Sequence, residues 1–393
     1  MASVAGVLPD WLDPCAWTLA PRVGKGRYRV DRYTDPVLAA LRSKGDPKTA
    51  RLIAHIAAGA GQGDPRTPGE RVKEFLDVLR AQPYFDIAGF QNQPYTKELR
   101  TWAGDIRLPA GTDKAALDRA AAFFVTRFFP LILIYSTSSL LNAYACHNAV
   151  QVLNSTELLS KHINRRLAQT LQLVIYVCAP EGFKPEGHAL DAIRKIKLMH
   201  GGVRFVVGRK AGYSTPRFGV PVNGEDLLGM TMGFSAVAIA DLQKLFLRPK
   251  PQQAADYIYL WNVVGRLLAA DARLLPRDED EAFALFDAIT RRQQAPSPQG
   301  VTMAKALVQF HRAFLGSLVD SVGIGVMRYL AGDRVCDMVG LPPVGPFENV
   351  WAIDLIGAVV DWGRGVIGHA KKKVGDLTVT AYDIPPSLAK LWK

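Results

Sequence analysis

The sequence is poor in the motifs that most metal and redox enzymes carry. Its 393 residues include only four cysteines, which form neither a CxxC nor a CxxCH pattern. This spacing argues against a zinc-thiolate site and excludes a covalently attached c-type haem. There is no HExxH, no helical ExxH pair, no Walker loop, and no GxSxG or GxGxxG between a strand and a helix. Metallohydrolases, di-iron bundles, serine hydrolases, kinases and nicotinamide enzymes thus lose their usual signatures.

Targeting segments and uninterrupted apolar runs are also scarce. Met1–Pro9 has no basic segment followed by a long apolar run, so a cytoplasmic location is expected, or secretion if a leader was removed. The most apolar stretch, 120–145, is interrupted by Arg127 and Pro130, which favours two buried helices over a membrane span. The basic residues behind the net charge of +12 are scattered and accompany no nucleic-acid motif. Their one dense run, 371–373, suits a solvated helix end or a membrane-surface contact.

Helix signals dominate what is present. A capping box at Thr67–Glu70 predicts the start of a helix, and a second at Asn223–Asp226 predicts a helix that runs to about Leu247. Strand-like runs are confined to 203–207 and 377–382, too few to build a sheet. The fold class is therefore all-α, with 49% hydrophobic residues available for its core.

The chain divides into three parts by composition. Residues 1–65, rich in Trp, Pro and basic side chains, indicate an N-terminal extension packed on the core. Residues 66–374 carry the helical patterns and would form the functional domain, and 375–393 would form a C-terminal strap.

His200 is the most informative of the seven histidines. The helical segment before it places Ile193, Ile196 and His200 on one apolar stripe, and Gly201-Gly202 is expected to end this helix. An imidazole on such a stripe is often a packed core residue, but it is also what an axial haem ligand requires. Arg204 would share this face and reach a haem propionate if the helix continued past the glycines.

A second helix, from about residue 155 to 178, carries Arg166, Gln169 and Thr170 at i, i+3 and i+4 between leucines. A polar face of this kind is commonly solvated. If it instead faces His200 across a haem, Arg166 and the Thr170 hydroxyl would polarise O2 on the iron.

Four segments in the middle and later parts of the chain have a specific order and spacing. They are "NRRLAQT" at 164–170, "AIRKIKLMHGGVR" at 192–204, "GVPVNGEDLLGMTMGFS" at 219–235 and "RYLAGDRVCDMVGLP" at 328–342.

In these segments the chain resembles the catalytic domain shared by rubber oxygenases of the latex clearing protein type and fungal MpaB-type oxygenases. The resemblance implies a globin-like helical core around a b-type haem, with additional N- and C-terminal helices. It implies His200 as the proximal iron ligand, with Arg166 and Thr170 on the distal side. It also implies that Arg204, Thr231 and Arg328 lie near the haem or the pocket wall.

The chain departs from this family at two distal positions. Gln169 stands where the latex clearing proteins have a lysine that can cap the iron, so lysine capping should be absent. The family's carboxylate base has no counterpart before Glu157 in "NAYACHNAVQVLNST". His147 has a suitable ordinary pKa to serve as the base, although a packed core histidine is the equal alternative.

The sequence therefore predicts a haem b-dependent dioxygenase that uses O2 to cleave C=C bonds of polyisoprene or a smaller prenylated compound to aldehyde and ketone. Two alternatives stay open: a haem-binding protein without turnover, and a haem-free lipid-binding or membrane-surface helical protein.

Overall fold

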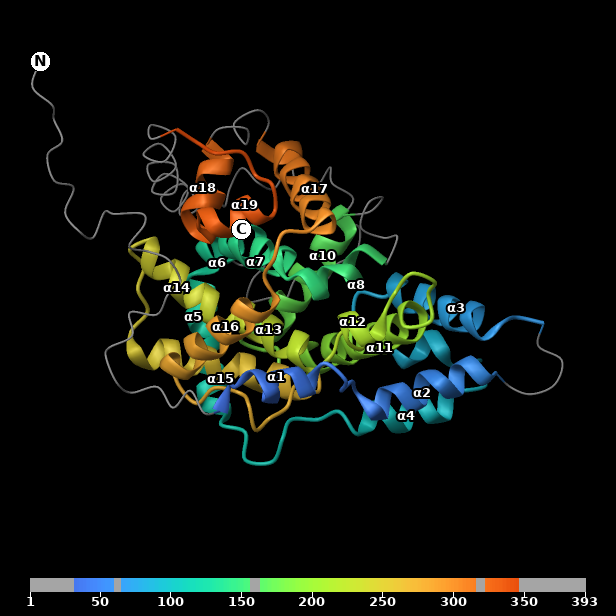
Figure 1. Ribbon diagram of the computed structural model, residues 1–393. Coiled ribbons are helices and arrows are strands. Elements are labelled where there is room, and N and C mark those ends of the chain that lie inside the picture. Colours follow the sequence, from blue (N-terminus) through green and yellow to red (C-terminus); the bar gives the residue numbers. More distant parts are fainter. Residues whose placement is uncertain (1–31, 60–64, 156–162, 316–321, 346–393) are drawn as a thin grey trace, which may run out of the picture.

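The structure is a computed structural model that describes residues 32–59, 65–155, 163–315 and 322–345 (Figure 1). Within these ranges the elements are helices, and the β contact is an isolated bridge between Cys146 and Gln294. The predicted all-α class is confirmed. The strand expected at 203–207 is wrong, because these residues continue a helix. The strand expected at 377–382 lies outside the described residues.

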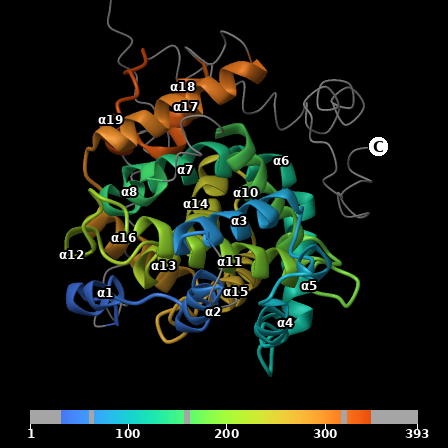
Figure 2. The ribbon, with the colours of Figure 1, turned by 90° about the vertical axis from the view of Figure 1, so that its right-hand side faces the viewer.

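The N-terminal half forms one flank of the molecule and part of its centre. Here α2 and α3 pack against each other and against α11, and Figure 2 shows α3 lying across α11. The elements are α1 (Asp35–Leu41), α2 (Pro47–Ala58), α3 (Pro68–Ala81), the 3-10 helix η4 (Ile87–Phe90), α4 (Thr96–Gly104), α5 (Lys114–Thr126), α6 (Phe128–Ile134), the π-helix η5 (Tyr135–Ser139), α7 (Leu140–Ala145), α8 (His147–Ser155) and α10 (Ile163–Cys178). Residues 33–58, from the predicted N-terminal extension, contribute to the same hydrophobic core as the later helices.

The C-terminal half completes the core and adds a group of helices at one end. The elements are α11 (Ala189–Val207), α12 (Thr215–Phe218), α13 (Gly224–Phe234), α14 (Ala236–Lys244), α15 (Pro251–Leu267), α16 (Glu279–Gln293), α17 (Pro298–Leu315), α18 (Val322–Ala331) and α19 (Asp333–Met338). Helix α15 packs along α5, and α13 packs against α14, α15 and α16.

Both predicted capping boxes are confirmed, but the second helix is shorter than expected. At α3 the Glu70 N–H donates to the Thr67 hydroxyl at 3.3 Å, and the Thr67 N–H donates to the Glu70 carboxylate at 2.7 Å. The helix that begins after Asn223 ends at Phe234 instead of continuing to about Leu247. The Tyr135 hydroxyl donates to the Phe234 carbonyl at 3.0 Å, so a neighbouring helix supplies a partner where the helical ladder is interrupted.

The apolar stretch before α8 consists of packed helices with a wide turn. Residues Phe128–Ala145 are long and apolar enough to cross a membrane, yet 61% of this window is buried inside the fold, as in the core helix of a folded domain. Its centre is the π-helix η5, whose Ser139 hydroxyl donates to the Gly233 carbonyl at 2.8 Å. The π-turn thus ties this segment to the end of α13.

Two separate hydrophobic clusters hold the described residues together. The larger one spans α1 to α16 and includes Val326 and Leu330 of α18, with Phe75, Trp261 and Tyr257 among its fully buried side chains. The smaller one joins α7 and α8 to α17, α18 and α19 through side chains such as Tyr144 and Leu307. Figure 1 shows α17, α18 and α19 together at the end of the molecule opposite α2 and α4.

Candidate functional site

Helix α11 does not end at its glycine pair, as the sequence predicted, but continues to Val207. The glycines serve close packing instead. A Cβ atom on Gly201 would lie 2.6 Å from Thr49 Cγ2 of α2, and one on Gly202 would lie 2.5 Å from Leu76 Cδ2 of α3. Since real Cβ contacts are longer than this, larger residues would force the helices apart. The glycine pair therefore marks the side of α11 that faces α2 and α3.

The opposite side of α11 carries His200. Ile196, Met199 and His200 stand at i, i+3 and i+4, so they share one face, which we call the His200 face. All three side chains are half-buried, and the His200 Nδ1 atom is buried. Helical geometry directs this face away from α2 and α3 and toward α8 and α10, the other helices against which α11 packs. The apolar stripe predicted around the imidazole is thus present on a continuous helix.

Helix α10 supplies the predicted distal residues. Because α10 is continuous from Ile163 to Cys178, its positions 166, 169 and 170 lie on one face. Gln169 and Thr170 are half-buried, while the Arg166 side chain lies outside the described part of the structure. The packing of α10 on α11 brings the two helices together, and the approach of Arg166 and Thr170 to His200 stays a prediction.

Helix α8 places His147 beside α12. The His147 ring lies 6.1 Å from the Phe218 ring, and among the described residues its buried Nδ1 has no hydrogen-bond partner. The next residue, Asn148, donates to the Gln293 side chain of α16 at 2.9 Å. His147 is therefore a half-buried imidazole on a helix that packs against α11, and its role as a base stays a prediction.

Sequence reasoning missed a carboxylate cluster that folding brings to α8. Gln293, bonded to Asn148, also donates to Glu225 Oε2 at 2.7 Å. Glu225 is fully buried and pairs with Arg42 at 3.0 Å and with Arg292 at 2.8 Å. The acidic pair that opens α13 in "NGEDLL" was the available signal, but distance along the chain concealed its place beside α8.

Asp226, the next residue along the chain, shares the Arg42 ion pair of this cluster. Burial raises its pKa to about 6, against the opposing charge of Arg42, which lies 3.5 Å away. Its carboxylate also accepts the Asn223 N–H at 3.2 Å in the capping box. A buried carboxyl with a raised pKa thus shares a cluster with Glu225, which is linked to α8 through Gln293.

Because α11 continues past the glycine pair, Arg204 stands one helical turn after His200 on the same helix, as the sequence predicted. Its Nε and Nη2 donate to the Val222 carbonyl at 3.2 and 2.7 Å. Burial lowers its pKa, opposed by Asp46 and Asp226. The guanidinium thus extends toward α2 and the loop before α13, and its contact with a propionate stays a prediction.

Thr231 and Arg328 each form hydrogen bonds within the protein, and these contacts give both side chains a structural role. The Thr231 hydroxyl is fully buried and donates to Leu227 of its own helix at 2.8 Å. It lies where α13 meets α15, since a Cβ on Gly265 would come within 2.6 Å of its oxygen. The Arg328 guanidinium donates to the Leu341 and Pro342 carbonyls at 2.7 Å and also binds two aspartates of α19. Their placement near a haem stays a prediction.

Comparisons with known proteins agree on one family. Residues 127–362, more than half of the chain, match the family described as "ER-bound oxygenase mpaB/B'/Rubber oxygenase, catalytic domain". A rubber oxygenase of Streptomyces sp. strain K30 is 22% identical over 347 residues, which cover 86% of this chain and 78% of the relative. The solved structure of a latex clearing protein in its closed state matches with a TM-score of 0.68 at 20% identity, covering 89% of this chain and 88% of that one. The resemblance seen in the sequence is therefore confirmed, and the chain belongs to the family of rubber oxygenase and MpaB-type oxygenase catalytic domains.

Proposed function

We propose that this protein is a haem b-dependent dioxygenase that cleaves C=C bonds of an apolar isoprenoid substrate. The observation that carries the proposal is the half-buried imidazole of His200 on an apolar face of α11, a helix that packs against α8 and α10. In the overall reaction, one C=C bond breaks and each of its carbons receives one oxygen atom of O2. The products are an aldehyde and a ketone, so no external reductant is required.

The residues present fit a haem better than a metal ion held by side chains alone. Among the described residues no three His, Cys, Asp or Glu side chains converge to hold a metal. A haem needs only one protein ligand, because its porphyrin supplies four nitrogens, and His200 offers that single donor. Ile196 and Met199 beside it are only half-buried and provide apolar surface for a large planar group. When bound, the haem would supply the redox chemistry that activates O2.

Each side chain around the site has a distinct task. His200 of α11 would hold the haem iron, and Arg204 of the same helix would bind a haem propionate. The Thr170 hydroxyl and the Arg166 guanidinium would donate hydrogen bonds to the reacting O2, and Gln169 stands where a lysine could otherwise bind the iron. His147 would accept a proton from the substrate, and the Asp226 carboxyl on α13 has a pKa that burial raises to about 6.

An isoprenoid chain has almost no groups that can form hydrogen bonds. An apolar lining must therefore hold such a substrate and exclude water. The apolar residues of the His200 face meet this requirement. Both polyisoprene and a smaller prenylated molecule satisfy it.

The absorption spectrum of the purified full-length protein, with and without dithionite, tests the haem. We expect a Soret band that shifts on reduction, and a colourless protein from cells grown with ample iron and haem precursor would contradict the proposal. Oxygen consumption with a prenyl substrate then tests catalysis. A protein with haem but no oxygen uptake would instead be a non-catalytic haem-binding protein.

Thr170→Ala tests the distal assignment. We expect this variant to retain the Soret band but to lose roughly 100-fold or more in turnover, the usual effect of removing one transition-state hydrogen-bond donor. Thr126→Ala, on α5, is the matched control, because its hydroxyl bonds only to a carbonyl of its own helix. Wild-type turnover in Thr170→Ala would remove this hydroxyl from the mechanism.

A further inference from the structure

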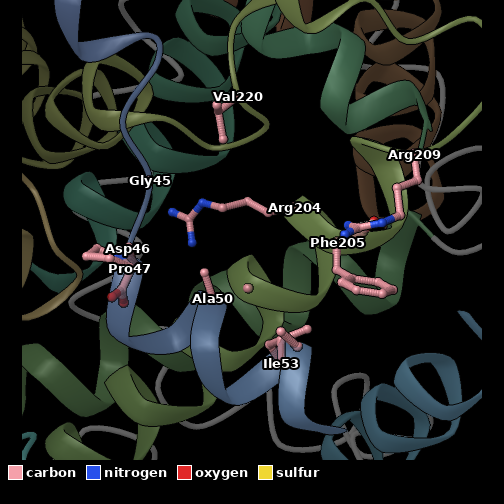
Figure 3. A pocket seen from close by; sticks show the side chains of 11 residues that line it. Gly45, Asp46, Pro47, Ala50, Ile53, Arg204, Phe205, Arg209 and Val220 are labelled. Carbon is pink, nitrogen blue, oxygen red and sulfur yellow. Dashed lines mark hydrogen bonds between the residues drawn. The ribbon is translucent and has the colours of Figure 1, made fainter. Parts of the chain in front are cut away.

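The end of α12 and the loop after it touch both α8 and the pocket around Arg204. Val220 of this loop lines that pocket, which has a volume of about 300 Å³, and Figure 3 shows the Arg204 side chain extending into it. The Val220 N–H donates to the Arg42 carbonyl at 2.8 Å. Phe218, the last residue of α12, places its ring 6.1 Å from the His147 ring of α8. Arg42 is therefore bonded to the segment that contacts His147.

The buried Nδ1 atom of His147 makes no hydrogen bond to the described residues. The side chain is half-buried at the first position of α8. The direction of the imidazole therefore depends mainly on the placement of the start of α8 and on the position of the Phe218 ring beside it.

The end of α16 holds the start of α8. The Asn148 side chain donates to the Gln293 side chain at 2.9 Å, and the Ala295 N–H donates to the Ala145 carbonyl at 3.0 Å. These contacts lie on both sides of His147 along the chain, one residue after it and two residues before it. The position of Gln293 therefore helps to decide where the backbone of His147 lies.

The Glu225 carboxylate joins the two groups of contacts. Its Oε2 atom accepts the Gln293 side-chain amide at 2.7 Å and Arg42 Nη1 at 3.0 Å. The same guanidinium donates from Nη2 to the Phe218 carbonyl. Because the donors of a guanidinium stand in a rigid planar fork, Arg42 fixes the position of the Phe218 backbone relative to Glu225.

Burial makes Glu225 a firm anchor. The residue is fully buried, and Arg292 donates to its second oxygen at 2.8 Å, so both carboxylate oxygens have charged partners. Displacing the carboxylate would leave buried charges without compensation, which is costly. The two chains of contacts that end at His147 therefore begin at a point that resists movement.

We propose that Glu225 is a positioning residue for His147. It acts through Gln293 on the start of α8 and through Arg42 on Phe218, so one buried carboxylate fixes both the helix and the ring that orient the imidazole. The value of this placement for catalysis rests on the proposed function, in which His147 accepts a proton, whereas the placement itself does not.

Modification of the histidines by diethyl pyrocarbonate, followed by peptide mass spectrometry on the full-length protein as purified, tests the placement. Gln293→Met removes both side-chain amide bonds but keeps a similar volume and every charge of the cluster. We expect His147 to react about threefold or more faster in this variant, because loss of such bonds releases a half-buried ring. The exposed His55 and the stacked His188 should react at wild-type rates in the same samples.

Gln243→Met is the matched control. It removes a bond of the same kind, in which the Gln243 amide donates to Glu279 at 3.0 Å in the first turn of α16. Equal reaction rates of His147 in Gln293→Met and in this control would overturn the proposal. Faster reaction of His55 and His188 as well would also overturn it, because Gln293 would then stabilise the fold in general.

Arg42→Lys tests the second route. Lysine keeps the positive charge but lacks the fork that holds Glu225 and the Phe218 carbonyl together. We expect His147 again to react about threefold or more faster, since the ring beside it is released. A wild-type rate would overturn the action of Glu225 on Phe218.

Oxygen uptake with a prenyl substrate connects the placement with the reaction. Gln293→Met should lower kcat about tenfold or more with little change in KM, because a misplaced proton acceptor affects the reacting state more than substrate binding. Unchanged kcat together with faster modification of His147 would overturn the role of this placement in catalysis. A wild-type protein without oxygen uptake would contradict the proposed function, while the modification rates would still decide whether Glu225 positions His147.

Discussion

The two sides of α11 differ in how completely they are filled. Toward α2 and α3 the helix presents Gly201 and Gly202, which allow contacts too close for any larger residue, and a buried ion pair between Lys197 and Asp46. Toward α8 and α10 it presents His200 and half-buried apolar side chains. One side fixes where the helix lies, and the other leaves an imidazole and apolar surface available to a ligand. Substitutions on the two sides should therefore separate stability from function.

His200→Ala gives the largest expected effect, and it falls on function. Removing the single proposed iron ligand should abolish the Soret band and oxygen uptake, while far-ultraviolet circular dichroism stays at the wild-type level. His188→Ala is the control, since His188 precedes α11 and stacks on Tyr84 at 3.9 Å. Full haem content in His200→Ala would show that another residue binds the iron.

Asp46→Asn should give the largest loss of stability on the packed side. It leaves the Lys197 ammonium buried without its counter-charge, which typically costs about 3–5 kcal/mol in the free energy of unfolding. Urea denaturation measures this loss. Adding Lys197→Met should recover much of it, because the stranded charge is then removed; a double variant as unstable as Asp46→Asn would show that the helix cap dominates.

Gly202→Val should destabilise the protein by a smaller amount. Its side chain would meet Leu76 of α3, and overpacking of this kind costs about 1–3 kcal/mol. Gly104→Ala is the control, because its Cβ would have no neighbour within 4 Å. If urea denaturation gave the same stability for both variants, the close approach of α11 to α3 would not be needed.

The pH dependence of the same ion pair should give the smallest effect. Although burial alone would raise it, the charge and hydrogen bond of Lys197, with hydrogen bonds from Thr49, hold the pKa of Asp46 below its ordinary value. The stability that this carboxylate contributes is therefore present above about pH 4 and is lost as the pH falls through its lowered pKa. The difference in unfolding free energy between wild type and Asp46→Asn should shrink between pH 6 and pH 3, and a constant difference would contradict this origin.

Local sequence signals were sufficient for parts of the fold that depend on neighbouring residues. The capping boxes at Thr67 and Asn223 were predictable because their hydrogen bonds join residues three apart. The apolar stripe containing His200 was predictable for the same reason, since helical spacing alone sets which side chains share a face.

Features that depend on distant contacts were not predictable. Gly201-Gly202 was taken as a helix end because glycine weakens isolated helices, but the contacts with Thr49 and Leu76 make its small size necessary. The break after Phe234 involves a hydroxyl from Tyr135, about a hundred positions away. Likewise, Glu225 reaches α8 only through Gln293, so no inspection of the residues around His147 would have found it.

The division of the apolar interior into two clusters has a consequence for motion. Because the buried apolar side chains of α17 and α19 belong to the smaller cluster, we expect these two helices to open without disrupting the side chains buried between α5 and α15. Local openings of this kind cost less free energy than global unfolding. Amide hydrogens of α17 and α19 should therefore exchange with solvent sooner than those of α15, and α10, which contacts α17, would be transiently uncovered along one edge.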